Sequence, residues 1–134
     1  MTHPLPANFR LIHLDLAREA GHPVGSMRDG YSLVLPIADD GRIDEQAAHA
    51  HGEACRVSRI AGGEPELGGV IRRGPGGHWT FDYGLETETP LRLSEHHFQP
   101  GEYLSVRRGE DEHTYVVISL QPIPAGSRVM DATA

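Results

Sequence analysis

The sequence contains no lysine, because all twelve basic residues among its 134 are arginine. Schiff-base chemistry and a phosphate-loop lysine are therefore excluded. The preference for arginine, together with abundant alanine, glycine and proline, is typical of a GC-rich bacterial genome. The net charge of -7 disfavours nucleic-acid binding, since contacts with phosphates require a local excess of positive charge.

Cysteine is almost absent as well, and the single Cys55 excludes an internal disulfide. The N-terminal residues show no basic region followed by an apolar run, so a secretory signal is not indicated. No window approaches the roughly 20 apolar residues that span a bilayer. These absences predict a cytoplasmic protein with no membrane partner.

Aromatic residues make up only 6% of the chain, whereas it contains 16 glycines and 10 prolines. This composition predicts a small aliphatic core with many turns and few helices. The length suits one domain rather than two. We expect a single barrel-like domain over residues 1–124 and a disordered tail over residues 125–134.

Short strands are predicted by alternation of apolar and polar residues with a period of two. Cys55, Val57 and Arg59, for example, would share one face of a strand. The predicted strands cover residues 9–16, 31–37, 55–60, 67–73, 78–83, 103–108 and 113–121. One short helix is predicted over residues 44–54, with Asp44 as its N-cap.

Three connecting segments complete this assignment. A polar connection over residues 17–30 ends in the turn signal Arg28-Asp29-Gly30, and residues 86–90 are predicted to be a solvated acidic loop. Leu91 and Leu93 suggest a brief edge strand. The pattern predicts a mostly β fold, a small antiparallel β-barrel or sandwich of about seven short strands with one short α-helix. Short hairpins and a narrow aliphatic interior favour the barrel.

Nine histidines are the most unusual feature of the composition, because imidazole is the commonest metal ligand in proteins. In the predicted helix, His51 and Cys55 are four residues apart and would share a face, a workable spacing for zinc. Further ligands would have to come from elsewhere in the chain, such as Glu95, His96 or His97. The alternative is a small buried cysteine with surface histidines. Zinc or another transition metal is therefore one hypothesis, and no cofactor is predicted.

Arginines and aromatic residues on neighbouring strands form a second candidate site. Trp79, Tyr83, Arg72 and Arg107 define a candidate binding surface. Its two arginines belong to a wider set of arginines on predicted strands, namely Arg56, Arg59, Arg72, Arg73, Arg107 and Arg108. A cleft lined by such arginines would suit a small anionic ligand or an acidic segment of a partner protein. Arginines beside turns can equally remain solvated or pair with carboxylates.

The run from Phe98 to Val106, followed by residues 113–116, resembles part of the flavin-binding barrel of ferredoxin reductase-like enzymes. In that family an Arg-x-Tyr-Ser/Thr motif holds the flavin. Here His113 stands in the position of the arginine and Val116 in that of the hydroxyl residue. The resemblance covers about the last quarter of the chain. It implies that a similar turn leads into a barrel strand in both.

Three stretches, residues 51–57, 79–83 and 98–106, also resemble small proteins of GC-rich bacteria that have no assigned activity. This resemblance implies a compact domain and carries no mechanism. Since no nucleophile, base and oxyanion donor converge in the sequence, we expect a non-catalytic binding or protein-interaction module. It could form a homodimer through an exposed strand or aromatic face. The alternative is a small metal-dependent enzyme using His51, Cys55 and His96 or His97.

Overall fold

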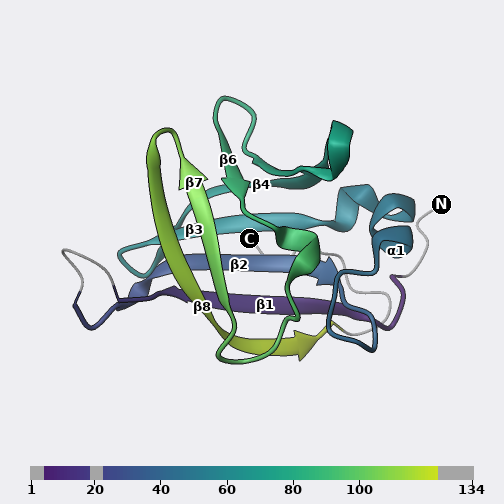
Figure 1. The fold of residues 1–134 in the computed structure, drawn as a ribbon, viewed down its shortest axis with the longest axis horizontal. Coiled ribbons are helices and arrows are strands. Elements are labelled where there is room, and N and C mark those ends of the chain that lie inside the picture. The colour runs from purple at the N-terminus through teal and green to yellow at the C-terminus, as the bar shows by residue number, and fades with distance from the viewer. Residues whose placement is uncertain (1–4, 19–22, 124–134) are drawn as a thin grey trace.

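A computed structural model describes residues 5–18 and 23–123 (Figure 1). Eight strands form a closed antiparallel barrel in which each strand pairs with the next, and β8 pairs with β1. The strands are β1 (Phe9–Leu16), β2 (Ser26–Pro36), β3 (Arg56–Ala61), β4 (Glu64–Arg73), β5 (Trp79–Asp82), β6 (Thr87–Pro90), β7 (Tyr103–Arg108) and β8 (Asp111–Pro122). The prediction of a mostly β barrel is confirmed, with eight strands rather than about seven. The predicted tail over residues 125–134 lies outside the described residues.

The connections between strands alternate between the two ends of the barrel, because successive strands are antiparallel. We call one end the open end. It carries the short connections over residues 62–63, 83–86 and 109–110 and the β1–β2 connection over residues 17–25. The opposite end, the capped end, carries the longer connections over residues 37–55, 74–78 and 91–102. These contain α1 (Glu45–Ala50) and the short 3-10 helices η1 (Gly52–Ala54), η2 (Pro75–Gly77) and η3 (Leu93–Glu95).

Helix α1 begins as the sequence predicts. The Asp44 Oδ1 atom accepts a hydrogen bond from the backbone N–H of Ala47 at 3.0 Å, so Asp44 is the N-cap. The predicted helix over residues 44–54 is divided into α1 and η1, because the chain leaves the helical conformation at His51. Ala48 and Ala54 are buried and attach both segments to the barrel. No helix within the described ranges is long and apolar enough to cross a membrane.

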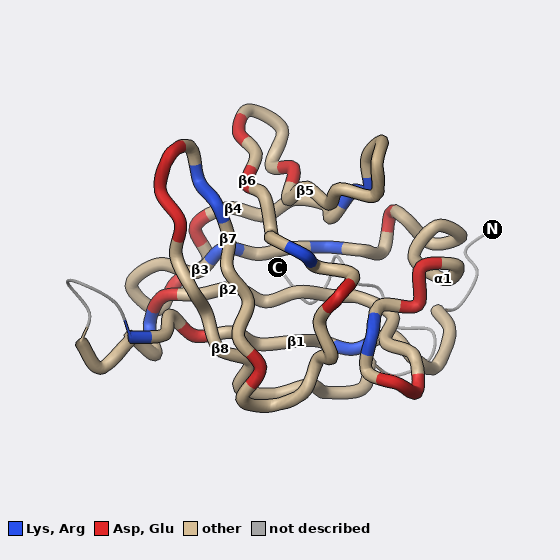
Figure 2. The backbone as a smooth tube through the Cα atoms, viewed as in Figure 1, with Lys and Arg blue, Asp and Glu red and all other residues tan. Residues whose placement is uncertain are grey.

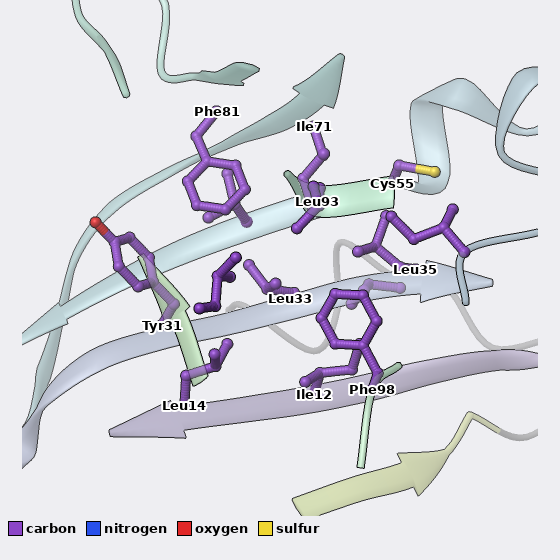
Figure 3. Close-up of a cluster of buried hydrophobic side chains, with 14 of the residues drawn as sticks. Ile12, Leu14, Tyr31, Leu33, Leu35, Cys55, Ile71, Phe81, Leu93 and Phe98 are labelled. Atoms are coloured by element: carbon purple, nitrogen blue, oxygen red, sulfur yellow. The ribbon is translucent and has the colours of Figure 1, made fainter. Parts of the chain in front are cut away.

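The core runs along the inside of the barrel from one end to the other (Figure 3). Tyr31 lies toward the open end, and Leu35 and Cys55 lie toward the capped end, beside the start of β3. Ile12, Leu14, Leu33 and Phe81 are fully buried and belong to the same cluster. An eight-stranded barrel is just wide enough for side chains to fill, and these side chains occupy its interior.

The predicted turn at Arg28-Asp29-Gly30 is wrong, because β2 already begins at Ser26. The register between β1 and β2 shifts between Asp15 and Leu16, where residues 27–29 of β2 have no partner on β1. A Cβ atom on Gly30 would lie 1.8 Å from the carbonyl oxygen of Leu14. Glycine is therefore required at this position for the close approach of two strands.

The predicted solvated loop over residues 86–90 is also wrong. Residues Thr87–Pro90 form β6, in which Glu88 pairs with Phe81 of β5 and is 1% exposed. The edge strand suggested by Leu91 and Leu93 does not form, and Leu93 is instead a buried residue of η3. The acidic segment becomes a strand because other parts of the barrel supply partners for the Glu88 carboxylate, as described next.

Candidate functional site

Glu88 is a carboxylate buried inside the open end of the barrel. Its Oε1 atom accepts hydrogen bonds from the Tyr31 hydroxyl at 2.8 Å and the Tyr83 hydroxyl at 2.6 Å. Its Oε2 atom accepts from Arg59 Nη1 at 2.5 Å and from Arg108 Nε at 2.7 Å. We call these five residues the Glu88 cluster. Both carboxylate oxygens are thus satisfied, which is what burial of an ion requires.

The strand geometry of the barrel assembles this cluster from five elements. Tyr31 of β2 and Arg59 of β3 are cross-strand partners, so their side chains leave the sheet on the same side. Arg108 is the last residue of β7, and Tyr83 directly follows β5. The Arg59 guanidinium also lies over the Tyr83 ring, 5.5 Å from its centroid. Each side chain is therefore fixed by at least one contact within the cluster.

Two further carboxylates, on the surface side of the cluster, balance the positive charge of Arg59. Glu66 Oε2 lies 2.8 Å from Arg59 Nε, and Glu86 Oε2 lies 3.4 Å from Arg59 Nη1. Both glutamates are half exposed, whereas the Glu88 side chain is completely buried. The Arg108 side chain is 42% exposed, and its ion pair within the described residues is with Glu88. Arg108 is thus the more accessible guanidinium of the pair.

The cluster keeps each member in one protonation state. Burial alone would raise the pKa of Glu88, but hydrogen bonds from Tyr83, Tyr31 and Arg59 and the charge of Arg108 outweigh it and lower the pKa below its usual value. Burial raises the pKa of both tyrosines strongly, and the Glu88 carboxylate adds to this effect. At neutral pH the carboxylate is therefore ionised and both hydroxyls are protonated.

A cavity of about 330 Å³ lies against the cluster at the open end. Arg59 and Arg108 both line it, together with His113 and the buried Tyr115. The remaining wall is formed by Leu16, Asp29, Gly30, Ile60, Ala61 and Glu66. The cavity therefore joins a charged side, with two arginines and the carboxylates of Asp29 and Glu66, to a small apolar side. Figure 2 shows the same mixture of charges along the β7–β8 hairpin, where arginine on β7 lies beside acidic residues on β8.

Comparison with protein-family models, curated proteins and solved structures finds no match to this chain. This result neither supports nor contradicts the two resemblances noted in the sequence. The barrel and the Glu88 cluster are therefore the basis for any functional assignment.

The histidine and cysteine candidates for metal binding do not meet in one place. Cys55 is buried, with Sγ 3.9 Å from the Ala48 carbonyl oxygen and 3.8 Å from that of His51. Burial, followed by the charge of Glu53, raises the pKa of this thiol to about 12. The His51 ring instead packs edge-on against Phe9, with ring centroids 6.0 Å apart. His51 and Cys55 are thus neighbours without forming a ligand pair.

His96 and His97 are engaged elsewhere at the capped end. His96 Nδ1 lies 3.2 Å from Glu102 Oε2, and His97 Nδ1 lies 2.8 Å from the Asp40 carbonyl oxygen. Among the described residues, no group of three or more His, Cys, Asp or Glu side chains could hold a metal ion. Metal binding stays a prediction, and no observation here favours it.

The candidate binding surface is divided by the barrel wall. Trp79 is 4% exposed and its indole N–H donates to Ser94 Oγ at 2.5 Å, so it is a core residue. Tyr83 belongs to the Glu88 cluster. Arg72 and Arg107 are exposed and pair with acidic residues, Nε to Asp82 Oδ2 at 3.0 Å and Nη2 to Glu112 Oε1 at 3.7 Å respectively. These four residues do not form one surface.

Sequence reasoning missed Glu88 and Tyr31, the acceptor and one donor at the centre of the cluster. Arg59 and Arg108 were included only as members of a wider set of arginines. The available signal was the alternation Glu86-Thr87-Glu88-Thr89, which has the period of a strand with β-branched residues on one face. An acidic residue on the other face of such a strand indicates either solvent or a buried cation.

Proposed function

We propose that this protein is a non-catalytic, cytoplasmic binding module that takes a small anionic ligand into the cavity at the open end of its barrel. The single observation that carries the proposal is the pair of guanidiniums, Arg59 and Arg108, held by one buried carboxylate at the wall of that cavity. Prepositioned guanidiniums are the usual protein groups for binding carboxylates and phosphates.

Binding is favoured over catalysis by the direction of the pKa shifts in the cluster. A general acid or base works best with a pKa near the operating pH. In the Glu88 cluster the carboxylate pKa is lowered and the two tyrosine pKa values are raised, so each moves away from neutrality. Groups that keep one charge state are suited to holding a ligand rather than to exchanging protons with it.

An anion is favoured at Arg108, because its ion pair among the described residues is with Glu88 alone and Glu88 is shared with Arg59. The half-exposed Glu66 and Glu86 pair with Arg59 as well, so the charge of Arg59 is more fully balanced by carboxylates than that of Arg108. His113 and Tyr115 line the same cavity. The volume of about 330 Å³ lies at the small end of ligand sites in proteins. The ligand is therefore expected to be a small carboxylate or phosphate compound with a short apolar part that faces Leu16 and Ile60.

The test is a titration of the full chain with inorganic phosphate and, separately, with acetate, followed by NMR of backbone amides and arginine Nε–H groups. We expect saturable shifts at Arg59, Arg108 and His113. Arg108→Gln should abolish them, because the accessible guanidinium is removed. Arg107→Gln is the matched control, since Arg107 is the preceding residue of β7 and pairs outside the barrel with Glu112.

Urea unfolding of both variants distinguishes loss of binding from loss of fold. Equal weakening by Arg107→Gln and Arg108→Gln would indicate non-specific attraction and would contradict the proposal. The same conclusion follows if neither anion gives a saturable shift at the three cavity residues.

A further inference from the structure

A second hollow, separate from the cavity of the Glu88 cluster, lies on the outside of the barrel. It has a volume of about 510 Å³ and is formed by β1, β8, the start of β2 and the start of β7. Thr114, Val116 and Ile118 line it, and they alternate along β8 with the buried Tyr115 and Val117. This alternation places the hollow on the outer face of the sheet. We call it the outer groove.

Exposed apolar side chains are concentrated at the outer groove. Five large hydrophobic residues of the described parts of the chain are exposed, and four of them line this groove: Val24 (87%), Met27 (85%), Tyr103 (61%) and Ile118 (46%). The fifth, Leu85, belongs to the β5–β6 connection. Scattered exposed apolar residues are ordinary, whereas a gathered patch marks a surface that binds a partner.

We infer that the outer groove binds the outer groove of a second copy of this chain, forming a two-fold symmetric dimer. An isologous interface must be complementary to itself. The groove meets this condition in shape, because Val24 and Met27 project almost fully beside the hollow that they help to form. Around a two-fold axis, the projecting side chains of each copy can therefore enter the hollow of the other.

The charges of the groove meet the same condition. Asp15 and Arg18 both line it, so one patch carries a negative and a positive side chain. The Asp15 carboxylate is held by His13 Nε2 at 2.8 Å and is only 12% exposed. A two-fold axis through the groove sets the exposed Arg18 of each copy against the groove of the other copy, whose lining includes Asp15. This pairing offsets part of the repulsion between two chains that each carry a net charge of -7.

The experiment is sedimentation velocity of the full chain over a series of concentrations. We expect a reversible monomer–dimer equilibrium. Met27→Glu should raise the dissociation constant of the dimer at least about tenfold, because the substitution places a charge within the apolar part of the proposed interface. Leu85→Glu is the matched control and should leave the constant unchanged, since Leu85 is at least as exposed as Met27 but lies outside the groove. Circular dichroism confirms that both variants are folded.

A second variant tests the two-fold arrangement. Arg18→Glu should also raise the dissociation constant, because it sets like charges against each other across the axis. The inference is overturned if the wild-type chain stays monomeric throughout the series, including the case in which the groove binds a peptide or lipid vesicles instead. It is equally overturned by a dimer that Met27→Glu and Arg18→Glu leave intact.

Discussion

At the capped end the barrel is closed by apolar side chains (Figure 3), whereas at the open end a carboxylate is buried among hydroxyls and guanidiniums. Leu35, Leu93 and Phe98 at the capped end each contribute by leaving water, largely independently of the identity of their neighbours. Glu88 at the open end is tolerated only because four hydrogen bonds reach it. Burial is thus stabilising by itself at one end and depends on a complete set of partners at the other.

Energies of the two kinds of burial make the difference quantitative. A fully buried leucine or phenylalanine stabilises a fold by about 1.5–3 kcal/mol. A buried ion costs several kcal/mol in lost hydration, which good partners roughly offset. The open end should therefore add little net stability, yet any single deletion there should be costly. This contrast can be tested by mutation at each end.

The largest effect is expected from Glu88→Ala. It leaves Arg59 and Arg108 facing each other without their shared carboxylate, so the free energy of unfolding should fall by about 3–5 kcal/mol. Urea denaturation measures this loss. Glu112→Ala, in an exposed pair with Arg107, is the control and should change stability by less than about 0.5 kcal/mol. A small effect of Glu88→Ala would mean that water replaces the carboxylate and that the two ends are not different in kind.

Leu35→Ala at the capped end should have a slightly smaller effect. Leu35 is fully buried, and its truncation should cost about 3 kcal/mol through lost burial and the cavity left behind. The loss measured by urea denaturation should be the same at every pH at which the protein is folded, because no charge is involved. A pH-dependent loss would show that the two ends are coupled.

The pH dependence of stability should come from the open end. The pKa of Glu88 is lower in the folded protein than its ordinary 4.5, so the stability it confers is present above pH 4.5 and is lost as pH falls through the folded value. The pKa values of Tyr31 and Tyr83 are raised from 10.0, so their contribution is lost as pH rises above 10.0. Each group changes stability by at most about 1.4 kcal/mol per pH unit.

Two variants separate these contributions in urea denaturation across the pH range. Glu88→Gln should reduce the acid dependence, and Tyr83→Phe should reduce the alkaline dependence. Acid and alkaline profiles identical to those of the wild type would show that the cluster does not control the pH response.

The smallest effect is expected at Cys55, where the capped end should be chemically inert. Its pKa of about 12, compared with an ordinary 9.0, makes the reactive thiolate roughly a thousandfold scarcer at neutral pH, and burial hinders access further. A thiol reagent should label the native protein only at the rate of local opening, and it should label the urea-unfolded protein at once. Rapid labelling of the native chain would show that α1 and η1 do not cover this end.

Local alternation predicted the capped end better than the open end. The pattern Cys55, Val57, Arg59 correctly predicted three residues that are all buried, Val57 and Arg59 in β3 and Cys55 just before it, and Asp44 correctly predicted the start of α1. The pattern could not show that the inner face of β3 is apolar near the capped end of the barrel and charged near its open end. The partners of Glu88 lie up to 57 residues away in the chain, and only closure of the barrel brings them together. A sequence pattern over a few residues therefore assigns an acidic residue to solvent when its cationic partners lie far away in the chain.

Because β6 is short, the Glu88 cluster helps to hold this strand in the barrel. This strand has two paired positions with β5 and two with β7, the fewest that hold any neighbouring strands of the described barrel together. Glu88 joins β6 to β2, β3 and β7 through side chains that cross the interior. Detaching β6 must break these bonds together with the backbone pairs. Closure of the ring and integrity of the charged cluster are therefore one cooperative event.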